Sequence, residues 1–375
     1  MISQAERLYW VGFNLIKGIG SVRFRVLLNA FGDAQTAWQA SAGDLRQAGL
    51  SQKIVDNLLQ VRSQVSLDQV WERLQHLQVS ALTWEDDEYP RRLKEIDQPP
   101  PVLYVRGTLQ EQDDWAVAMV GTRHATAYGR QVADEVSATL ARSGVTVVSG
   151  LARGVDSIAH QAALNAGGRT LAVLGCGVDV IYPPENRRLA MQIIEHGALI
   201  SDYPLGTAPE SQNFPPRNRL ISGISQAVIV IEAGVTSGSL ITATFAVEQG
   251  RDVFAVPGSI LAPQSQGTNR LIRDGAAPLL SPQDVLEALN LDLVTEHRAA
   301  RVALPTEPVE LQLYQVLGHE PMHVDDIRAQ ANLPIERVSA TLALMELKGT
   351  VRQLGGMFYV AVREPSGDYQ VGENA

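Results

Sequence analysis

The chain has 375 residues, 45% hydrophobic and 19% charged, with a formal net charge of −10. This length predicts two or three domains, and the acidic balance excludes a broadly basic nucleic-acid binder. No apolar run reaches the roughly 20 residues of a membrane span, no signal-peptide pattern is present, and the lone Cys176 excludes internal disulfides, so we expect a cytoplasmic, non-membrane protein.

Residues 1–80 have apolar positions at helical spacing and predict a helical domain. Near its start, two predicted helices flank a Gly-Ile-Gly turn, which is the helix-hairpin-helix pattern. Exposed amides and basic side chains there can hold a phosphate. The candidates for a second DNA contact are Lys17, Gly18, Gly20, Arg23 and Arg25. The same pattern also serves as a plain helical packing unit.

Residues 85–290 alternate short apolar runs with helical stretches. Continuous apolar strands joined by helices predict a Rossmann-like, mostly parallel, doubly wound α/β sheet. The six expected strands are 116–120, 145–149, 170–174, 198–201, 227–231 and 252–256. In such a sheet, ligands bind at the carboxyl ends of the strands.

The loops after these strands are rich in glycine and arginine. Glycine lets backbone amides approach a ligand closely, and helix N-termini favour phosphate. Phe214 adds a stacking surface of the kind that single-strand binders use, although it is equally a packing residue in a long loop. The arginines expected at one rim are Arg123, Arg153, Arg217 and Arg219.

Catalytic groups are not apparent in these loops. His160 follows Asp156 by four residues and suits a buried network better than a general base. The acids expected to bind loop amides or a ligand hydroxyl are Asp179, Glu185 and Glu232. The serines that lack an evident His and acid partner in the sequence are Ser149, Ser237 and Ser239. No spacing suits a metal, and Gly175-Cys176-Gly177 lacks the third glycine of a dinucleotide fingerprint. We therefore expect no catalytic residue, metal or cofactor.

The remaining chain predicts a linker over 291–308, a winged helix over 309–363 and a tail over 364–375. Helices over 309–318, 323–331 and 335–348 precede two strands over 350–354 and 357–362. The charges of the third helix nearly cancel, which favours contact with protein over reading of DNA.

Seven motifs occur in order along residues 105–285: GTR, SGLARGVDSIAH, GCGVDVIYPPEN, NFPPRNRLISG, EAGVTSGSLITA, VFAVPG and GTNRLIRDGA. This set resembles the DprA/Smf family of DNA-processing proteins. The resemblance implies a non-catalytic homodimer, formed through the Rossmann-like domain, that binds single-stranded DNA and loads RecA recombinase onto incoming strands during natural transformation. The DNA-binding residues expected from the loops and the resemblance together are Gly121, Thr122, Arg123, Ser149, Gly150, Arg153, Phe214, Arg217, Asn218 and Arg219. The loop before Phe214 carries Glu210 and no lysine, unlike some members.

Two enzyme classes compete with this interpretation. Lysine-decarboxylase-like phosphoribohydrolases use a similar domain but carry a Pro-Gly-Gly-x-Gly-Thr loop, whereas this chain has Glu232-Ala-Gly-Val-Thr-Ser-Gly-Ser at that place. An NAD-dependent oxidoreductase is disfavoured by the incomplete fingerprint.

Overall fold

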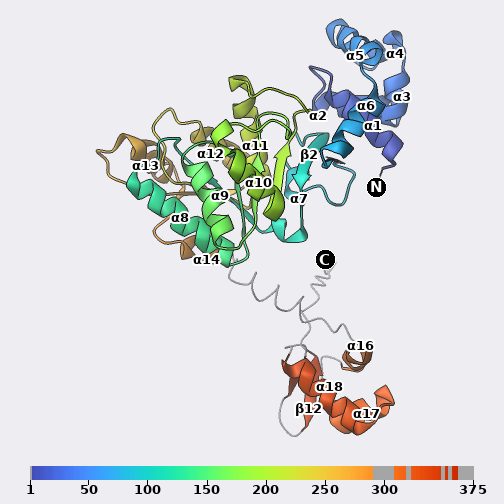
Figure 1. The fold of residues 1–375 in the computed structure, drawn as a ribbon, viewed down its shortest axis with the longest axis vertical. Coiled ribbons are helices and arrows are strands. Elements are labelled where there is room, and N and C mark those ends of the chain that lie inside the picture. The colour runs from blue at the N-terminus through green and yellow to red at the C-terminus, as the bar shows by residue number, and fades with distance from the viewer. Residues whose placement is uncertain (1, 290–307, 318–321, 348–350, 354–356, 362–375) are drawn as a thin grey trace, which may run out of the picture. The chain divides into compact units, whose positions relative to one another are not determined.

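A computed structural model describes residues 2–289, 308–317, 322–347, 351–353 and 357–361 (Figure 1). The chain divides into two compact units, Met1–Asp292 and Leu293–Ala375, each of which is considered by itself. The predicted linker up to residue 307 and the predicted tail lie outside the described residues.

The first unit contains one nine-stranded sheet in the order β1-β2-β6-β5-β4-β3-β7-β8-β9. Neighbours from β6 to β9 are parallel, whereas β2 runs antiparallel to both β6 and β1. The strands are β1 Val79–Thr83, β2 Val102–Gly107, β3 Ala116–Val120, β4 Thr146–Ser149, β5 Thr170–Val173, β6 Gly197–Ser201, β7 Ala227–Val230, β8 Asp252–Ala255 and β9 Ala277–Pro278.

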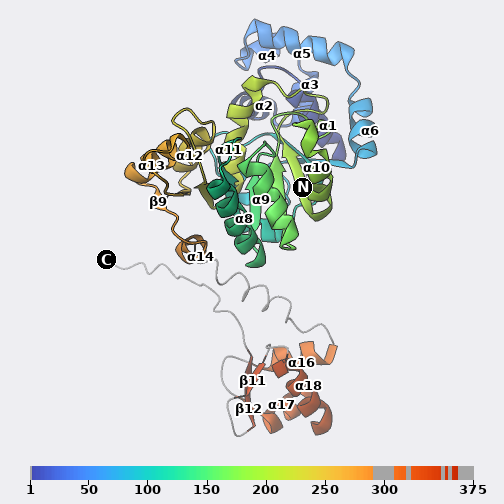
Figure 2. The same cartoon turned by 60° about the vertical axis from the view of Figure 1, so that its left-hand side comes forward.

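Helices cover both faces of this sheet, as Figures 1 and 2 show. The helices that follow the N-terminal region pack as two rows, α8–α9–α10 on one face and α7–α11–α12 on the other. They are α7 Arg91–Lys94, α8 Ala127–Arg142, α9 Val155–Asn165, α10 Arg187–His196, α11 Phe214–Ile224, α12 Ser239–Glu248, α13 Gln266–Arg273 and α14 Gln283–Ala288. Short 3₁₀ turns lie at η1 Glu111–Asp114, η2 Pro184–Asn186, η3 Ser211–Asn213 and η4 Pro263–Ser265.

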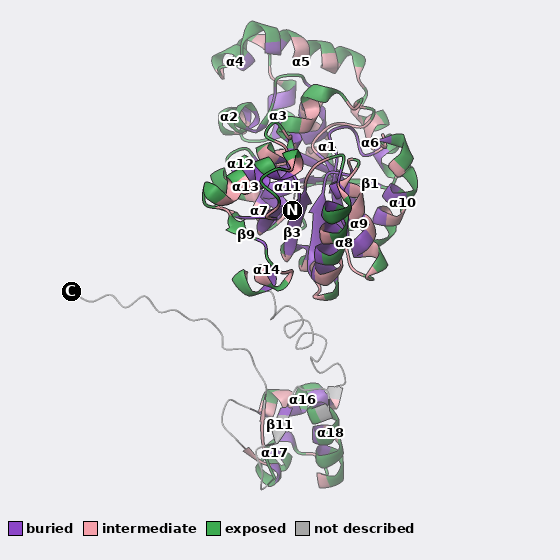
Figure 3. Ribbon diagram, turned by 90° about the vertical axis from the view of Figure 1, so that its left-hand side faces the viewer, coloured by how far each residue is buried: buried purple, intermediate pink, exposed green. Residues whose placement is uncertain are grey.

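Alternation along the strands separates two hydrophobic cores. In β5 and its extension, Leu171 and Val173 pack with α11 and α12, while Ala172 and Leu174 pack with α10. Such alternation follows from the two-residue period of a strand. The central strands β3, β4, β5, β6 and β7 are buried throughout, and Figure 3 shows exposed residues mainly on the outer sides of the helices. Each fully buried aliphatic side chain stabilises the fold by about 1.5–3 kcal/mol.

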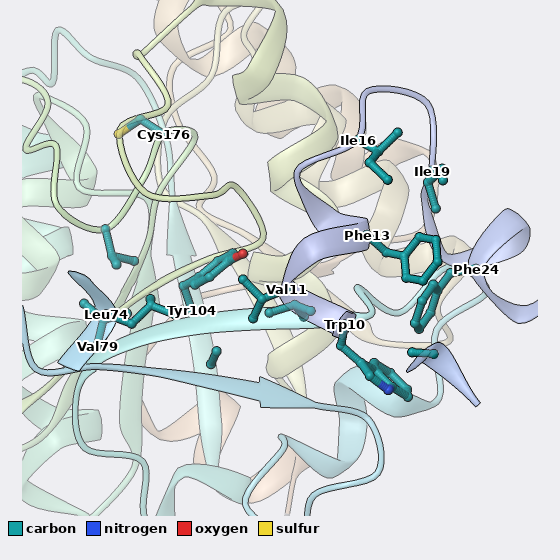
Figure 4. Close-up of a cluster of buried hydrophobic side chains, with 14 of the residues drawn as sticks. Trp10, Val11, Phe13, Ile16, Ile19, Phe24, Leu74, Val79, Tyr104 and Cys176 are labelled. Carbon is teal, nitrogen blue, oxygen red and sulfur yellow. The ribbon is translucent and has the colours of Figure 1, made fainter. Parts of the chain in front are cut away.

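The N-terminal helices belong to the same compact unit. Trp10 and Phe13 pack against Phe24, with ring centroids 4.7 and 5.3 Å away (Figure 4). Tyr104 of β2 donates a hydrogen bond of 3.0 Å to Asn14 Oδ1. These helices are α1 Gln4–Asn14, α2 Ser21–Phe31, α3 Ala34–Gln39, α4 Ala42–Gln47, α5 Gln52–Gln64 and α6 Leu67–His76.

The second unit is a winged helix, as the sequence predicts. Its helices share a core that includes Leu313, Ile327, Val338 and Leu342, and its small sheet has the order β10-β12-β11. The elements are α16 Pro308–Val316, β10 Met322–His323, α17 Val324–Ala331, α18 Ile335–Leu347, β11 Val351–Gln353 and β12 Phe358–Ala361.

The predicted fold class is confirmed, and all six expected strands are present. Three strands of the first unit were not predicted: the antiparallel β1 and β2 at one edge, and the two-residue β9 at the other. In the second unit the two-residue β10 was not predicted either. Strand β1 begins at Val79, where the sequence predicts the end of a helical domain. No helix in the described ranges combines the length and apolarity needed to cross a membrane.

Candidate nucleic-acid interface

A pocket of about 620 Å³ lies at the carboxyl edge of the sheet, between the ends of β3 and β7. Strands β4, β5 and β6 extend from β3 in one direction and β7, β8 and β9 in the other, so this is the topological switch point. Ligands of doubly wound sheets bind there. The wall on the β3 side includes Gly121, Thr122, Arg123 and His124; the opposite wall includes Gly234, Thr236, Ser237, Gly238, Ser239 and Thr242.

Hydrogen bonds to Glu232, which follows β7, hold the loop after β3 in place. Thr122 N donates to Glu232 O at 2.7 Å, and the buried Glu232 carboxylate accepts from Thr126 N at 2.9 Å and from the Thr126 hydroxyl. Thr126 in turn caps α8. Arg123 is exposed and has no hydrogen-bond or ion-pair partner among the described residues. The loop therefore presents a free guanidinium from a fixed backbone.

Arg217 lies on the pocket floor but is a buried structural cation. It is 4% exposed, and its Nη1 donates to Gly150 O at 3.1 Å and to Val173 O. Burial lowers the pKa of Arg217, and the neighbouring Asp156 opposes this. Asp156 accepts from Gly150 N at 3.1 Å and Ala152 N at 3.3 Å. Arg217 thus joins the ends of β4 and β5 to α11, and its donors are partly occupied by carbonyls.

An aromatic pair forms one side of the pocket. The rings of Phe214 and Tyr182 lie 5.7 Å apart with a tilt of 34°, and the Arg217 guanidinium is 5.8 Å from the Phe214 ring. A Cβ at Gly175 would lie 2.7 Å from Phe214 Cδ1, so this glycine makes room for the ring. Tyr182 is 38% exposed, which leaves a surface suited to base stacking.

The predicted site residues only partly converge. Gly121, Thr122, Arg123, Phe214, Arg217 and Asn218 line the main pocket, and Gly150 and Arg153 line a small adjoining cavity that shares Arg123 and Phe214 with it. Ser149 is fully buried, and its hydroxyl donates to Met119 O at 2.6 Å. Ser149 therefore supports the loop from beneath and does not line the pocket.

Arg219 also departs from the expected rim. Its Nη1 donates to Gln98 O at 2.6 Å, and its Nη2 pairs with Asp202 at 2.7 Å. Residues two apart on an α-helix are about 200° apart around its axis, so Arg217 and Arg219 cannot face the same site. All four arginines lie near the carboxyl edge of the sheet, but they do not share one site: Arg123 and Arg153 line the cavities from exposed positions, Arg217 is buried beneath them, and Arg219 pairs with Asp202 after β6 and lines neither cavity.

Tyr182 is the residue that sequence reasoning did not select. It lines both cavities. The signal for it was the aromatic side chain inside the Tyr-Pro-Pro run, 32 positions before Phe214. Nothing local indicates that the two rings meet.

Arg153 is held by a carboxylate at the rim. Its Nε donates to Glu185 Oε1, and the two side chains are 60% and 49% exposed. Arg153 lowers the pKa of Glu185 through this contact. A phosphate that approaches Arg153 must therefore compete with Glu185.

Replacing Glu185 with glutamine should raise affinity for single-stranded DNA a few-fold at low salt, because exposed ion pairs are weak and the released guanidinium becomes available. Fluorescence anisotropy with a labelled oligonucleotide measures this. Glu248→Gln, an equal charge change on exposed α12, is the control. A fall in affinity would show instead that Glu185 holds Arg153 in a binding orientation.

His160 lies in a buried network beneath the pocket. Thr170 Oγ1 donates to Val147 O at 2.7 Å, so it accepts from His160 Nδ1 at 2.6 Å, which leaves His160 Nε2 without a proton. Nε2 has no partner among the described residues. Burial, with a contribution from Arg217, lowers the pKa of His160 to about 3. His160 is therefore a neutral packing residue and not a general base.

This histidine should contribute to acid sensitivity. Its folded pKa lies below the ordinary 6.5, so the unfolded chain takes up a proton between pH 6.5 and about 3 that the folded chain does not. Stability is then lost as pH falls, by up to about 1.4 kcal/mol per pH unit. His160→Gln should reduce this slope in urea unfolding between pH 7 and 5. Parallel curves for His160→Gln and the native chain would contradict the assignment.

The three candidate acids all accept hydrogen bonds from other groups of the protein. Glu232 binds Thr126, Glu185 binds Arg153, and Asp179 accepts from Gly206 N at 2.8 Å and Arg73 Nη2 at 2.7 Å. Within the part of the chain that the structure describes, no three His, Cys, Asp or Glu side chains cluster as metal ligands.

The hairpin candidates form a separate group in the α1–α2 loop and the first turns of α2. Lys17, Gly18 and Gly20 are exposed, and Gly18 has a φ of +102° that favours glycine. Arg23 Nη1 donates to Gly18 O at 2.7 Å, and Arg25 lies over the Trp84 ring at 5.2 Å. Both arginines thus have intramolecular contacts, and DNA binding by this loop stays a prediction.

Two family models match this chain. Residues 80–290 match the family described as DNA recombination-mediator protein A, and residues 297–357 match the DprA winged helix domain. Protein Smf of Synechocystis sp. is 37% identical over 395 residues, which cover 96% of this chain and 99% of that protein.

Two solved structures are similar. The X-ray structure of DNA processing protein A from Streptococcus pneumoniae is 34% identical with a TM-score of 0.67, covering 76% of this chain and 98% of that one. DNA processing protein A from Helicobacter pylori, in a structure concerned with its single-stranded DNA binding mode, is 32% identical with a TM-score of 0.52, covering 58% and 98%. With its family match over 80–290 and a relative aligned along nearly its whole length, the chain belongs to the DprA/Smf family of DNA recombination mediators.

Proposed function

We propose that this protein binds single-stranded DNA at the switch-point pocket and acts as a non-catalytic recombination mediator. The observation that carries the proposal is the free Arg123 guanidinium in one pocket with the Phe214–Tyr182 pair. Cationic donors bind phosphates, and aromatic faces stack on unpaired bases of any sequence. The relative from Helicobacter pylori, studied for its single-stranded DNA binding mode, supports this ligand.

The pocket explains how an acidic chain can bind a polyanion. The net charge of −10 gives long-range repulsion, whereas binding depends on charges within about 10 Å of the phosphate at ordinary salt. Arg123 and Arg153 supply these charges at the rim. In duplex DNA the bases are stacked inward and unavailable to the aromatic pair, so the geometry favours single strands.

The partners proposed from the family are RecA recombinase, loaded onto incoming strands during natural transformation in the cytoplasm, and a second copy of this chain. The edge beyond β8 suits self-association: β9 is two residues long and Ile260, Leu261 and Leu280 are 83%, 86% and 77% exposed. Exposed apolar side chains near a short sheet edge are typical of interaction surfaces.

The alternative is a nucleotide hydrolase of the phosphoribohydrolase type. Its candidate acid, Glu232, is 3% exposed and bound to both the amide and the hydroxyl of Thr126, so its carboxylate serves the α8 cap. This bonding favours binding over hydrolysis.

A mobility-shift comparison of single- and double-stranded oligonucleotides of increasing length tests the proposal. We expect tighter binding to single strands, with affinity that falls as salt rises. Equal affinity for duplex would contradict it. Incubation with nucleoside monophosphates should release no free base, and release that Glu232→Gln abolishes would establish the hydrolase instead.

A further inference from the structure

The wall of the pocket opposite Arg123 carries hydroxyl groups and no cation. We define the hydroxyl wall as Thr236, Ser237, Ser239 and Thr242, which come from the loop after β7 and the first turns of α12 and all line the pocket. None of the expected DNA-binding residues lies in it.

The wall sits at the positive end of a ten-residue helix. The residue before α12 is Gly238, which provides no side-chain cap, so the helix dipole faces the pocket without a carboxylate. Ser237 Oγ and Ser239 Oγ lie 2.8 Å apart, and Asn218 Nδ2 donates to Gly238 O at 3.3 Å. The loop is therefore held in place by α11, the helix that also carries Phe214.

Thr242 gives an independent indication of a ligand. It is 1% exposed, lines the pocket one turn beyond Ser239, and has a hydroxyl that makes no hydrogen bond with any described residue. This oxygen is not among the sealed polar atoms that lack a partner, so it opens to the pocket, where a ligand can reach it. A pocket ligand with acceptor oxygens would supply the missing partner.

We infer that the hydroxyl wall is a second phosphate subsite, which holds a backbone phosphate of the same strand whose neighbouring phosphate contacts Arg123. This inference rests on the proposed binding of single-stranded DNA. Two acids border the pocket region: Asp156 lies beside Arg217, and Glu232 is bound to Thr126. Arg217 offsets the charge of Asp156, and the Glu232 carboxylate faces Thr126 and is not among the groups that line the pocket. A strand would thus cross the switch point from the β3 side to the β7 side.

Thr242→Val tests the subsite, because valine keeps the shape and removes only the hydroxyl. We expect an approximately tenfold loss of single-strand affinity, the size of one hydrogen bond to a charged group, with Thr242→Ser close to the native chain. Thr244→Val is the matched control, since Thr244 lies on the exposed side of α12 and its hydroxyl donates to Leu240 O. Combined Ser237→Ala and Ser239→Ala is the second variant, should Thr242→Val fold poorly.

Two readouts separate a phosphate contact from other roles. A neutral donor releases no counterion from DNA, so the loss should appear without a change in salt slope, whereas Arg123→Gln should reduce the slope by about 0.7. The loss should also be equal on thymine, adenine and abasic oligonucleotides. A loss that disappears on abasic DNA would assign the wall to base contact and overturn the inference.

Thymidine 5′-monophosphate tests the other source of phosphate. Displacement of the oligonucleotide by micromolar nucleotide would show a mononucleotide site and overturn the backbone assignment. If native protein binds single strands and Arg123→Gln weakens it while both wall variants bind normally, the subsite is wrong and the proposed function stands. If the native protein does not bind single strands, the proposed function itself fails.

Discussion

Arg123→Glu should reduce affinity for single-stranded DNA by at least about a hundredfold. Loss of a charge-assisted hydrogen bond costs roughly 1.5–3 kcal/mol, and the introduced carboxylate adds repulsion to the phosphate. Because Arg123 is exposed and without an intramolecular partner, the free energy of unfolding should change by less than about 0.5 kcal/mol. Anisotropy titration and urea unfolding measure the two quantities.

Arg142→Glu is the matched control for this prediction. Arg142 is exposed at the C-terminal end of α8, whereas Arg123 lies just before that helix begins, and the net-charge change is the same. If both variants lose equal affinity, only overall charge matters and the pocket assignment is wrong. Selective loss in Arg123→Glu places the contact at the switch point.

Arg217→Met should destabilise the first unit by about 3–5 kcal/mol, the cost expected when a buried charge loses the opposite charge that compensates it. The substitution leaves Asp156 buried beside an apolar side chain and removes a donor from two carbonyls, Gly150 O and Val173 O. DNA binding should also fall, because the loops at the ends of β4 and β5 lose the link between them. Urea unfolding followed by tryptophan fluorescence measures the change.

Arg153→Met is the control, since this exposed arginine should leave stability within about 0.5 kcal/mol of the native chain. Asp156→Asn combined with Arg217→Met should cost less than the sum of the single changes, because the two residues share one buried interaction. Native stability in Arg217→Met, with only DNA binding lost, would instead make Arg217 a direct phosphate contact.

The sequence predicts the parallel part of the sheet well because buried parallel strands are almost continuously apolar. Apolar runs such as 116–120 and 227–231 leave few alternatives to a buried strand. Because these strands are parallel, the loops that follow them lie at the same edge of the sheet. This is why Gly121, Arg123 and Asn218 meet as expected.

The sequence could not predict which face of a helix turns inward, or which segments distant in the chain come together. Nothing in Arg217-Asn-Arg219 indicates which arginine faces inward, since both neighbours of Asn218 are equally basic. Tyr182 meets Phe214 only because two loops from different strands fold together. Strands β1 and β2 depend on antiparallel pairing with each other and with β6, which lies about 90 residues beyond β2.

The shared core of the N-terminal helices and the sheet has a practical consequence for dissecting this protein. A fragment that begins near residue 85 would lose β1 and bare the edge of β2, together with the face of Tyr104 that α1 covers. Such a fragment would expose an unpaired strand and aromatic surface, a combination prone to aggregation. Aggregation of a truncated chain would therefore result from the loss of β1 from the sheet, and would not show that the helices bind DNA.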